Sequence, residues 1–304
     1  PIQSFALDFV MTDDSLKVFQ NKKEAIVSFS LEDNFLIGHQ ATQKIKEKLG
    51  AYKLRSIKYS SSTSELAIDQ ILKQGDSLIC TGFISGKNLK SKFTLLFIEK
   101  NGKVEYQISF ENPGINFIDF KFSSKAEIQY FGGGEQFSFC NLKGHEIPML
   151  VEENGIGRGD KRVTGLAKLL GVQGSEYTTY APIPFFIGTD HIAFSIDNSI
   201  FSLVDFTESE EVKIKIWDKS LKGSFWQADS PKELLTSLKG RYHMVNGIAK
   251  LVDESCLDKD IDLRSIFGCK DVVCKICYGD SHKISNSRYV GIIAAQTLSE
   301  PATQ

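Results

Sequence analysis

The residues best suited to binding or acid–base chemistry lie in one glycine-rich stretch, Phe131 to Asp160, which reads FGGGEQFSFCNLKGHEIPMLVEENGIGRGD. Eight of its thirty residues are Gly or Pro, and aromatic side chains and paired carboxylates lie between them. Glycines at this density allow positive φ and a close approach of the backbone to a partner. Connections usually run about 4–6 residues, and much longer ones are functional or disordered. Because this stretch is too aromatic for a disordered linker, we predict an ordered loop region that lines a site.

Within this stretch, Gln136 and Arg158 are the best candidates for contact with a polar ligand, because a guanidinium group matches anionic oxygens. A structural ion pair of Arg158 explains that residue equally well. Glu135 could pair with Glu152 or Glu153 as two carboxylates for acid–base chemistry. The simpler interpretation, which we favour, is that Glu135 hydrogen-bonds loop backbone, while Glu152 and Glu153 form a turn that is solvated or bonded to Arg158. We therefore predict Glu135, Gln136 and Arg158 as substrate-binding residues and predict no catalytic residue.

Two histidines, His145 and His191, are also candidates for acid–base work. No Ser or Cys nucleophile motif accompanies either of them, and nucleophilic catalysis needs such a partner. We interpret both as strand-surface or hydrogen-bonded histidines.

A second group of residues with chemical potential is a cysteine cluster near the end of the chain. Of the six cysteines, four lie between residues 256 and 277, whereas Cys80 and Cys140 lie in apolar or aromatic sequence and are predicted to be small core fillers. A Cys-x2-Cys pair allows two thiolates to bind one ion, and closed four-cysteine zinc sites are tetrahedral and structural. Such a site supplies folding free energy to a segment with a small core, and four free cysteines are the alternative. We predict a structural Zn²⁺ held by Cys256, Cys269, Cys274 and Cys277.

The elements that position the glycine-rich stretch are predicted to be strands. From Phe5 to about Trp226 apolar and polar residues alternate with a period of two, as in half-buried strands. The residues Asn101-Gly102 are a type I′ hairpin signal between two β-rich runs. Many short strands with turn residues at this spacing indicate a mainly β protein, an antiparallel β-sandwich. The predicted strands include residues 26–31, 78–83, 92–98, 104–110, 115–122, 185–187, 192–196, 201–206 and 211–217.

Few helices are predicted. Residues 41–49 and 165–170 could each form a few helical turns. The clearest helix covers residues 230–240, where Ser230 is a good N-cap and Glu233 completes a capping box. After Gly240 the alternation ends and the cysteines begin, so we predict a sandwich domain at 1–240 and a small zinc-knuckle and helix segment at 241–304.

Composition excludes several classes of function. The net charge of −2 and the pI near 6.3 give no overall attraction to nucleic acid or to a membrane. No apolar run reaches the roughly 18 residues of a membrane-spanning helix, and the first residues lack the pattern of a signal peptide. Crowded cysteines suit a metal site in a reducing compartment better than a secreted disulfide framework, so we expect the cytoplasm.

Several motifs between residues 131 and 206 resemble, in order, the N-terminal β-sandwich domain of family 31 glycoside hydrolases. The Gly-Glu-Gln-Phe and Gly-Ile-Gly-Arg-Gly forms are most similar to the sulfoquinovosidase and α-glucosidase-like branch. The resemblance implies a galactose-mutarotase-like sandwich whose glycine-rich loops help to shape a carbohydrate site. The motifs are Phe131-Gly-Gly-Gly-Glu-Gln-Phe137, Leu142-Lys-Gly144, Pro148, Glu152-Glu153, Gly155-Ile-Gly-Arg-Gly159, Tyr177-Thr-Thr-Tyr-Ala-Pro-Ile-Pro184, Asp197-Asn-Ser199 and Asp205-Phe206.

In that family the sandwich packs on a (β/α)8 barrel that carries the catalytic pair. A retaining glycosidase needs two carboxylates about 5 Å apart, and they lie at the ends of barrel strands. The residues after Gly240 do not resemble a barrel, so the resemblance gives no catalytic residue to any position of this chain. We expect no glycoside hydrolysis by this chain alone.

The C-terminal residues resemble a different family, the β′ subunit of multisubunit RNA polymerase. The similar residues are Cys269-x4-Cys274-x2-Cys277-Tyr-Gly279 and the stretch from Val290 to Gln304. In that family four cysteines hold a structural zinc, and the following helix leads into the trigger loop. The Cys269–Cys274 spacing is shorter than usual, and Ser299 and Ala302 replace glycines. The Asp triplet that binds Mg²⁺ in the polymerase is absent from the sequence.

These resemblances leave three hypotheses for a chain that looks like a fusion or fragment. The first is a non-catalytic domain of a glycosidase, with a carbohydrate ligand and a barrel as partners. The second is a sandwich that binds a protein partner or itself through its exposed barrel-docking face, since large apolar faces seldom stay bare. The third is part of an RNA polymerase β′ subunit that associates with polymerase subunits. We rank them in this order.

Overall fold

The computed structural model describes residues 7–20, 24–48, 51–54, 56–136, 138–152, 157–158 and 160–234. All of them belong to one compact unit, Pro1–Leu234. The second unit, Leu235–Gln304, contains the predicted zinc segment and lies outside the described residues. No helix among the described residues is long and apolar enough to cross a membrane.

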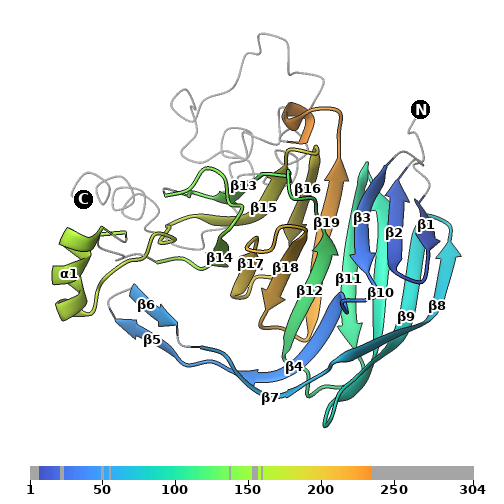
Figure 1. Ribbon diagram of the computed structural model, residues 1–304, viewed down its shortest axis with the longest axis horizontal. Coiled ribbons are helices and arrows are strands. Elements are labelled where there is room, and N and C mark those ends of the chain that lie inside the picture. Colours follow the sequence, from blue (N-terminus) through green and yellow to red (C-terminus); the bar gives the residue numbers. More distant parts are fainter. Residues whose placement is uncertain are drawn as a thin grey trace, which may run out of the picture. The chain divides into compact units, whose positions relative to one another are not determined.

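The described unit is built from antiparallel sheets (Figure 1), as the sequence predicts. An eight-stranded sheet has the order β13 (Tyr130–Gly134), β15 (Pro182–Gly188), β16 (Ile192–Ile196), β19 (Ser220–Gln227), β11 (Lys103–Phe110), β10 (Lys90–Lys100), β9 (Ser77–Ser85), β8 (Glu65–Gln74). A six-stranded sheet has the order β14 (Glu146–Met149), β17 (Ser202–Asp205), β18 (Glu211–Ile216), β12 (Phe117–Ser123), β4 (Leu36–Thr42), β7 (Lys58–Ser62). Smaller sheets consist of β1 (Leu7–Met11), β2 (Ser15–Gln20) and β3 (Ala25–Ser30), and of the hairpin β5 (Ile45–Lys48) and β6 (Ala51–Leu54).

Aromatic side chains join the two large sheets. Phe122 of β12, in the six-stranded sheet, has ring centroids of Phe194 and Phe225 at 5.0 and 5.4 Å, both from the eight-stranded sheet. Phe120 lies 5.5 Å from Tyr106 in the same way. All five residues are buried, and burial of such large apolar side chains is the dominant force that holds two sheets face to face. The prediction of an antiparallel β-sandwich is therefore confirmed.

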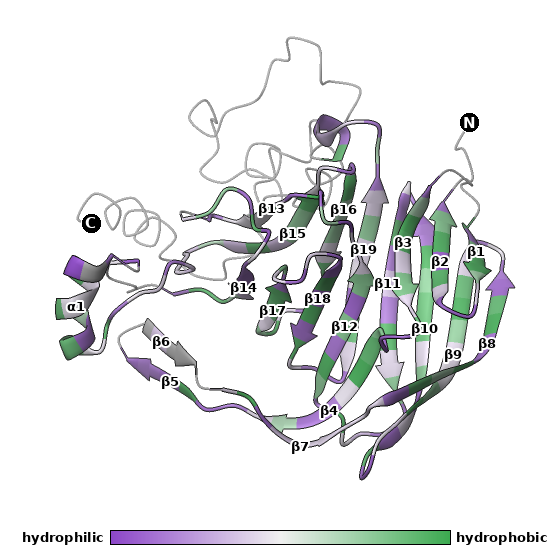
Figure 2. Cartoon of the chain, in the orientation of Figure 1, coloured by the Kyte–Doolittle hydropathy of each residue, from purple (hydrophilic) through white to green (hydrophobic). Residues whose placement is uncertain are grey.

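The strands with the strongest local signals lie where the sequence predicts them. Val212, Ile214 and Ile216 of β18 are fully buried and alternate with half-buried Lys213 and Lys215, and Figure 2 shows such alternation of hydropathy along several strands. The β10–β11 hairpin turns at Asn101 and Gly102, with φ of 56° and 79°. Positive φ at both central residues is the requirement of a type I′ turn.

The predicted helix at residues 41–49 is wrong. Residues 36–42 form β4, which pairs with β7, and residues 45–48 form β5, which pairs with β6. The Ala, Gln, Lys and Glu residues here have good helix propensity, but propensity is a weak prior that tertiary pairing overrides. A register shift between Gln40 and Ala41 also disrupts the alternation that would have indicated a strand.

The helix at 165–170 is confirmed as part of α1 (Lys161–Leu170). Asp160 caps it, because its carboxylate accepts hydrogen bonds from the Arg162 and Val163 amides, and Gly171 ends it with a φ of 72°. The beginning of the 230–240 helix is also confirmed. Residues 231–234 are helical, the Glu233 amide donates to Ser230 Oγ at 3.4 Å, and the Glu233 carboxylate accepts from the Asp229 amide at 3.1 Å.

Candidate functional site

The glycine-rich stretch is less of a loop than predicted, because it contributes β13 to one sheet and β14 to the other. Gly132, Gly133 and Gly134 have φ of 125°, 76° and 83°, and the β13–β15 register shifts between Gly132 and Gly133. A Cβ atom would lie 2.2 Å from the Phe185 carbonyl oxygen at Gly132 and 2.1 Å from the Ala181 carbonyl oxygen at Gly134. Glycine is required here for both reasons, and the resulting bulge directs the chain into the turn that carries Glu135 and Gln136.

Glu135 and Gln136 lie in the turn that follows β13. The Glu135 amide donates to the Ala181 carbonyl at 3.0 Å, and its side chain is exposed. The Gln136 side-chain amide donates to the Gly133 carbonyl at 3.0 Å, which closes the turn. The Glu135 carboxylate is thus presented to solvent at the edge of the eight-stranded sheet, while Gln136 helps to hold the turn.

Arg158 has a left-handed backbone with φ of 39°. Its Nη1 donates to the Thr178 carbonyl at 3.0 Å, and its guanidinium carbon lies 5.6 Å from the centroid of the exposed Tyr180 ring. A guanidinium at this distance from an aromatic face forms a cation–π contact. These contacts fix the half-buried guanidinium group beside residues 178–180. The next residue, Ala181, accepts the hydrogen bond from the Glu135 amide.

Glu152 is buried and hydrogen-bonded, which agrees with a structural role and differs from the solvated or Arg158-bonded turn that we expected. Its Oε1 accepts from the Tyr52 amide at 2.9 Å and its Oε2 accepts from the Thr178 hydroxyl at 2.5 Å. Thr178 therefore links Glu152 and Arg158, one through its hydroxyl and the other through its carbonyl. Glu153 lies outside the described residues.

The histidines occupy positions typical of packed or turn residues. The His145 ring stacks on Phe139 with centroids 3.7 Å apart, and its Nδ1 lies 3.2 Å from the Tyr177 hydroxyl. His191 has a φ of 61° in the turn between β15 and β16, where its amide donates to the Gly188 carbonyl at 3.1 Å.

A cavity of about 270 Å³ lies beside Glu152 and Tyr177. Burial, followed by the charges of Glu176 and Glu146, raises the pKa of Tyr177, so its hydroxyl stays protonated. Sequence reasoning did not single out Tyr52, whose contribution depends on the hairpin β5–β6 and on a contact across about a hundred residues of chain. The cavity is lined by Tyr52, Glu146, Pro148, Leu150, Glu152, Ser175, Tyr177 and Leu203.

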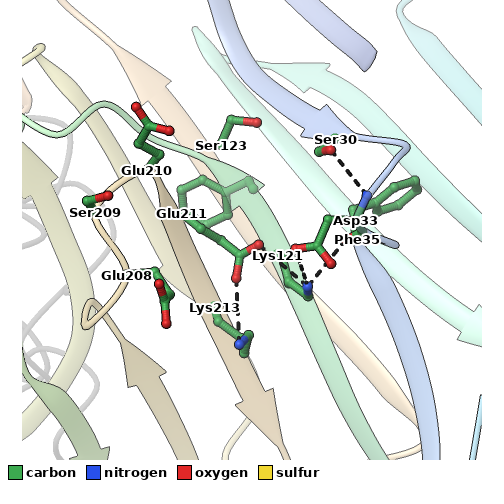
Figure 3. A pocket seen from close by; sticks show the side chains of 11 residues that line it. Ser30, Asp33, Phe35, Lys121, Ser123, Glu208, Ser209, Glu210, Glu211 and Lys213 are labelled. Carbon is green, nitrogen blue, oxygen red and sulfur yellow. Dashed lines mark hydrogen bonds and ion pairs between the residues drawn. The ribbon is translucent and has the colours of Figure 1, made fainter. Parts of the chain in front are cut away.

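A larger cavity of about 450 Å³ lies beside β12 and β18 of the six-stranded sheet, and many of its lining residues are charged (Figure 3). Lys121 Nζ lies 2.9 Å from Asp33 and 3.5 Å from Glu211, and Lys213 Nζ lies 3.6 Å from Glu211. The hydrogen bond from Lys121 lowers the pKa of Asp33, whereas burial raises the pKa of Glu211. Both lysines of this cavity are paired with its own carboxylates, so the cluster has the character of a structural ion-pair network.

The predicted zinc ligands Cys256, Cys269, Cys274 and Cys277 lie outside the described residues. The other cysteines are free thiols. Cys80 is buried, as predicted for a core filler, and burial raises the pKa of its thiol to about 12. Cys140 is exposed, so the prediction that it fills the core is wrong.

Comparison with known proteins shows two separate similarities. No family model matches the chain. The chain is 28% identical over 178 residues to the sulfoquinovosidase of Escherichia coli (strain K12), which covers 57% of this chain and 26% of that enzyme. It is 28% identical over 127 residues to the sulfoquinovosidase of Agrobacterium fabrum, with 41% of this chain and 19% of the enzyme covered. The chain thus spans about a quarter or less of the length of these relatives.

The second sequence similarity is short. A stretch of 61 residues is 43% identical to the RNA polymerase β′ subunit of Metamycoplasma arthritidis, and it covers 18% of this chain and 4% of the subunit.

Among solved structures, a GH31 family sulfoquinovosidase from E. rectale, in complex with the aza-sugar inhibitor IFGSQ, shares the fold. The TM-score is 0.68 at 18% identity, with 79% of this chain and 35% of the enzyme covered. Most of the chain therefore has the fold of part of a family 31 enzyme.

Proposed function

We propose that residues 1–240 are the N-terminal β-sandwich domain of a family 31 α-glycosidase of the sulfoquinovosidase type, which shapes a sugar site and does not cleave glycosides alone. The observation that carries this proposal is the agreement between two independent comparisons. Sequence similarity over 57% of the chain and fold similarity over 79% of it both lead to sulfoquinovosidases.

The geometry of the glycine-rich stretch supports a role in ligand contact. The glycines of β13 let its backbone pack closely against β15, and this packing holds the turn of Glu135 and Gln136 at the edge of the sheet. The exposed Glu135 carboxylate and the Arg158 guanidinium both lie beside the segment 178–181. A carboxylate accepts hydrogen bonds from sugar hydroxyls, and a guanidinium group binds anionic oxygens. Glu135, Gln136 and Arg158 are accordingly our proposed substrate-binding residues.

The proposal assigns bond cleavage to a (β/α)8 barrel, whose strand ends position two carboxylates about 5 Å apart. Helix α1 offers a surface for such a partner. Val163, Leu166, Leu169 and Leu170 are 50%, 69%, 84% and 59% exposed, and their spacing of three and four residues places them on one side of the helix. Exposed apolar patches of this kind mark interaction sites. The barrel is the proposed partner, and self-association through the same face is the alternative.

The test is an assay of the 304-residue chain with a chromogenic α-sulfoquinovoside, together with saturation-transfer NMR of the same sugar. We expect no release of the chromophore and weak binding that Arg158→Ala reduces more than about tenfold, with unchanged thermal stability. Leu169→Asp is the matched control, because it changes α1 and leaves the loops intact. Hydrolysis by the chain alone contradicts the proposal, and a large loss of thermal stability in Arg158→Ala means that the residue is structural.

A second candidate function follows from the C-terminal motifs that resemble the RNA polymerase β′ subunit, together with the short sequence similarity of the chain to that subunit. We propose that Cys256, Cys269, Cys274 and Cys277 hold one structural Zn²⁺, since thiolates with Cys-x2-Cys spacing suit this ion. Zinc would stabilise the folded form of residues 241–304 in either of the two proposed functions. The proposed location is the cytoplasm, where cysteine thiols stay reduced.

Metal analysis of the intact chain by mass spectrometry tests the zinc proposal. One zinc per chain is expected, and Cys274→Ser is expected to lower this content to well below one. Substitution of the buried Cys80 by Ser is the control and leaves the zinc content unchanged. A chain without zinc, or hydrogen-exchange protection of residues 251–304 that is identical in Cys274→Ser, argues against the metal site.

A further inference from the structure

The six-stranded sheet has a face that points away from the aromatic core, here called the outer face. Its strand register places Pro148, Leu203, Lys215 and Asp119 in one row across β14, β17, β18 and β12. These residues alternate along their strands with buried core residues, and successive side chains of a strand point to opposite faces. The outer face is therefore a continuous surface in which apolar and polar side chains are neighbours.

One edge of the outer face is covered to form the 270 Å³ cavity. Glu146, Pro148 and Leu203 are its residues from the six-stranded sheet, and Tyr52 and Tyr177 come from outside this sheet. The hydrogen bonds of Glu152 to the Tyr52 amide and to Thr178 hold the aromatic residues in place. The volume is close to the lower end of small-ligand sites, about 300 Å³, and a tyrosine offers an apolar ring face together with a hydroxyl group.

The charges of this cavity favour a neutral ligand. Its described lining includes the carboxylates of Glu146 and Glu152 and contains no lysine or arginine. Both oxygens of Glu152 accept hydrogen bonds from the protein. Glu146 pairs with Lys215 through Oε1 at 2.5 Å, and its side chain is 41% exposed, so it can accept a further hydrogen bond from a ligand hydroxyl. An anionic ligand would be repelled by these carboxylates and would find no lysine or arginine in the described lining to pair with.

From the cavity the outer face continues across β17 and β18 to Asp119 of β12, His39 of β4 and Tyr59 of β7. Trp217, which directly follows β18, lies on the same side, with its ring centroid 4.5 Å from that of Phe117. Burial, followed by the charge of Asp119, raises the pKa of Tyr59. The Tyr59 ring lies 4.7 Å from the His39 ring. Within the described residues, His39 Nε2, Asp119 Oδ1 and Trp217 Nε1 are buried and have no hydrogen-bond partner.

Buried polar atoms without partners are rare and call for an explanation. The indole N–H of Trp217 needs an acceptor and the Asp119 oxygen needs a donor. A hydroxyl group can supply both. His39 Nε2 lies 3.6 Å from Asp119 Oδ2, which is too long for a hydrogen bond, so these groups do not satisfy one another. Tyr59 is 48% exposed, and an exposed side chain changes rotamer rapidly, which would give a ligand access to them.

We propose that the outer face is a second saccharide site, distinct from the turn of Glu135 and Gln136 and from Arg158, that binds a neutral sugar against Tyr52 and Tyr177 with a hydroxyl on Glu146. An oligosaccharide extends from this cavity toward Tyr59, where further hydroxyls pair with Asp119 and Trp217. This site needs neither Arg158 nor a catalytic barrel. Its ligand is a neutral sugar, whereas the guanidinium group of Arg158 favours an anionic one.

Isothermal titration calorimetry of the 304-residue protein with maltotriose, and with glucuronate as the anionic comparison, tests this proposal. We expect maltotriose to bind at least about tenfold more tightly than glucuronate. Tyr177→Ala removes a wall of the cavity and Leu203→Trp fills it, so each weakens maltotriose binding about tenfold or more. Tyr180→Ala, an exposed tyrosine beside Arg158, is the matched control and leaves the affinity unchanged.

Thermal unfolding verifies that each variant is folded, and Leu203→Trp keeps the test decisive should Tyr177→Ala disturb its loop. The proposal is overturned by absent maltotriose binding, by tighter binding of glucuronate, or by maltotriose binding that neither cavity variant weakens. Loss of maltotriose binding in Arg158→Ala, with Leu203→Trp unaffected, would place the neutral sugar at the loops. That result would overturn the second site and leave the function proposed for the loops standing.

Discussion

At the scale of single residues, Lys215 organises the charges of the outer face. Its Nζ lies 2.5 Å from Glu146 Oε1 and 3.0 Å from Asp205 Oδ2. Burial opposes the charge of the ammonium group, but the hydrogen bonds to both carboxylates outweigh it and raise the pKa of Lys215. Burial likewise opposes the Asp205 carboxylate, while hydrogen bonds from Thr207 and Lys215 hold the pKa of Asp205 below its ordinary value of 3.8. The charged forms of these residues are the stable ones in the folded protein.

This arrangement predicts a pH dependence for Asp205→Asn. Since the folded pKa of Asp205 lies below its unfolded value, the carboxylate contributes stability above that unfolded value, and the contribution disappears as the pH falls through the folded pKa. At neutral pH we expect Asp205→Asn to lower the free energy of unfolding by about 2 kcal/mol. The difference between variant and parent should shrink below about pH 4.

Urea unfolding at a series of pH values measures this difference. Asp69→Asn, at an exposed position of β8, is the matched control and should lower stability by less than about 0.5 kcal/mol at each pH. A constant penalty for Asp205→Asn from neutral to acid pH would mean that packing, and not charge, explains the loss.

At the scale of elements, the sequence predicts best those strands whose signal is local. The alternation of β18 and the Asn101-Gly102 turn of β10–β11 each lie within a few residues, and both were predicted correctly. The strand β13 has no such signal, because glycine has low β-propensity. It forms because its bare backbone fits closely against β15. The wrongly predicted helix at 41–49 has the same cause, a pairing between distant residues that overrides propensity.

The residues of the candidate site also differ in whether the sequence predicts them. Glu135, Gln136 and Arg158 lie in motifs that resemble a known family, so the sequence indicated them. Tyr52 gave no signal, because it faces the site only after the hairpin β5–β6 has formed and Glu152 has bonded to it. Contacts of this range depend on the whole fold, and alternation or capping patterns cannot reveal them.

At the scale of the whole described unit, the aromatic core makes one cooperative structure of the two large sheets. Phe194 of β16 lies 5.0 Å from both Phe122 and Phe186, and it is almost fully buried. Its ring therefore contacts both layers of the sandwich. The chain's two tryptophans report on these layers separately, since Trp226 belongs to β19 in the eight-stranded sheet and Trp217 directly follows β18 in the six-stranded sheet.

We predict that Phe194→Ala lowers the free energy of unfolding by about 3–5 kcal/mol, the usual cost of emptying a large core site. Both sheets should lose this stability together, because neither can keep its inner face buried without the other. Fluorescence-monitored urea unfolding of the single-tryptophan variants Trp217→Phe and Trp226→Phe, each with and without Phe194→Ala, measures the effect sheet by sheet. Phe83→Ala, at a 46% exposed position, is the control and should cost less than about 1 kcal/mol. We expect equal shifts of both transitions. A shift confined to the Trp226 signal would show that the six-stranded sheet, with its outer face, unfolds independently of the eight-stranded sheet.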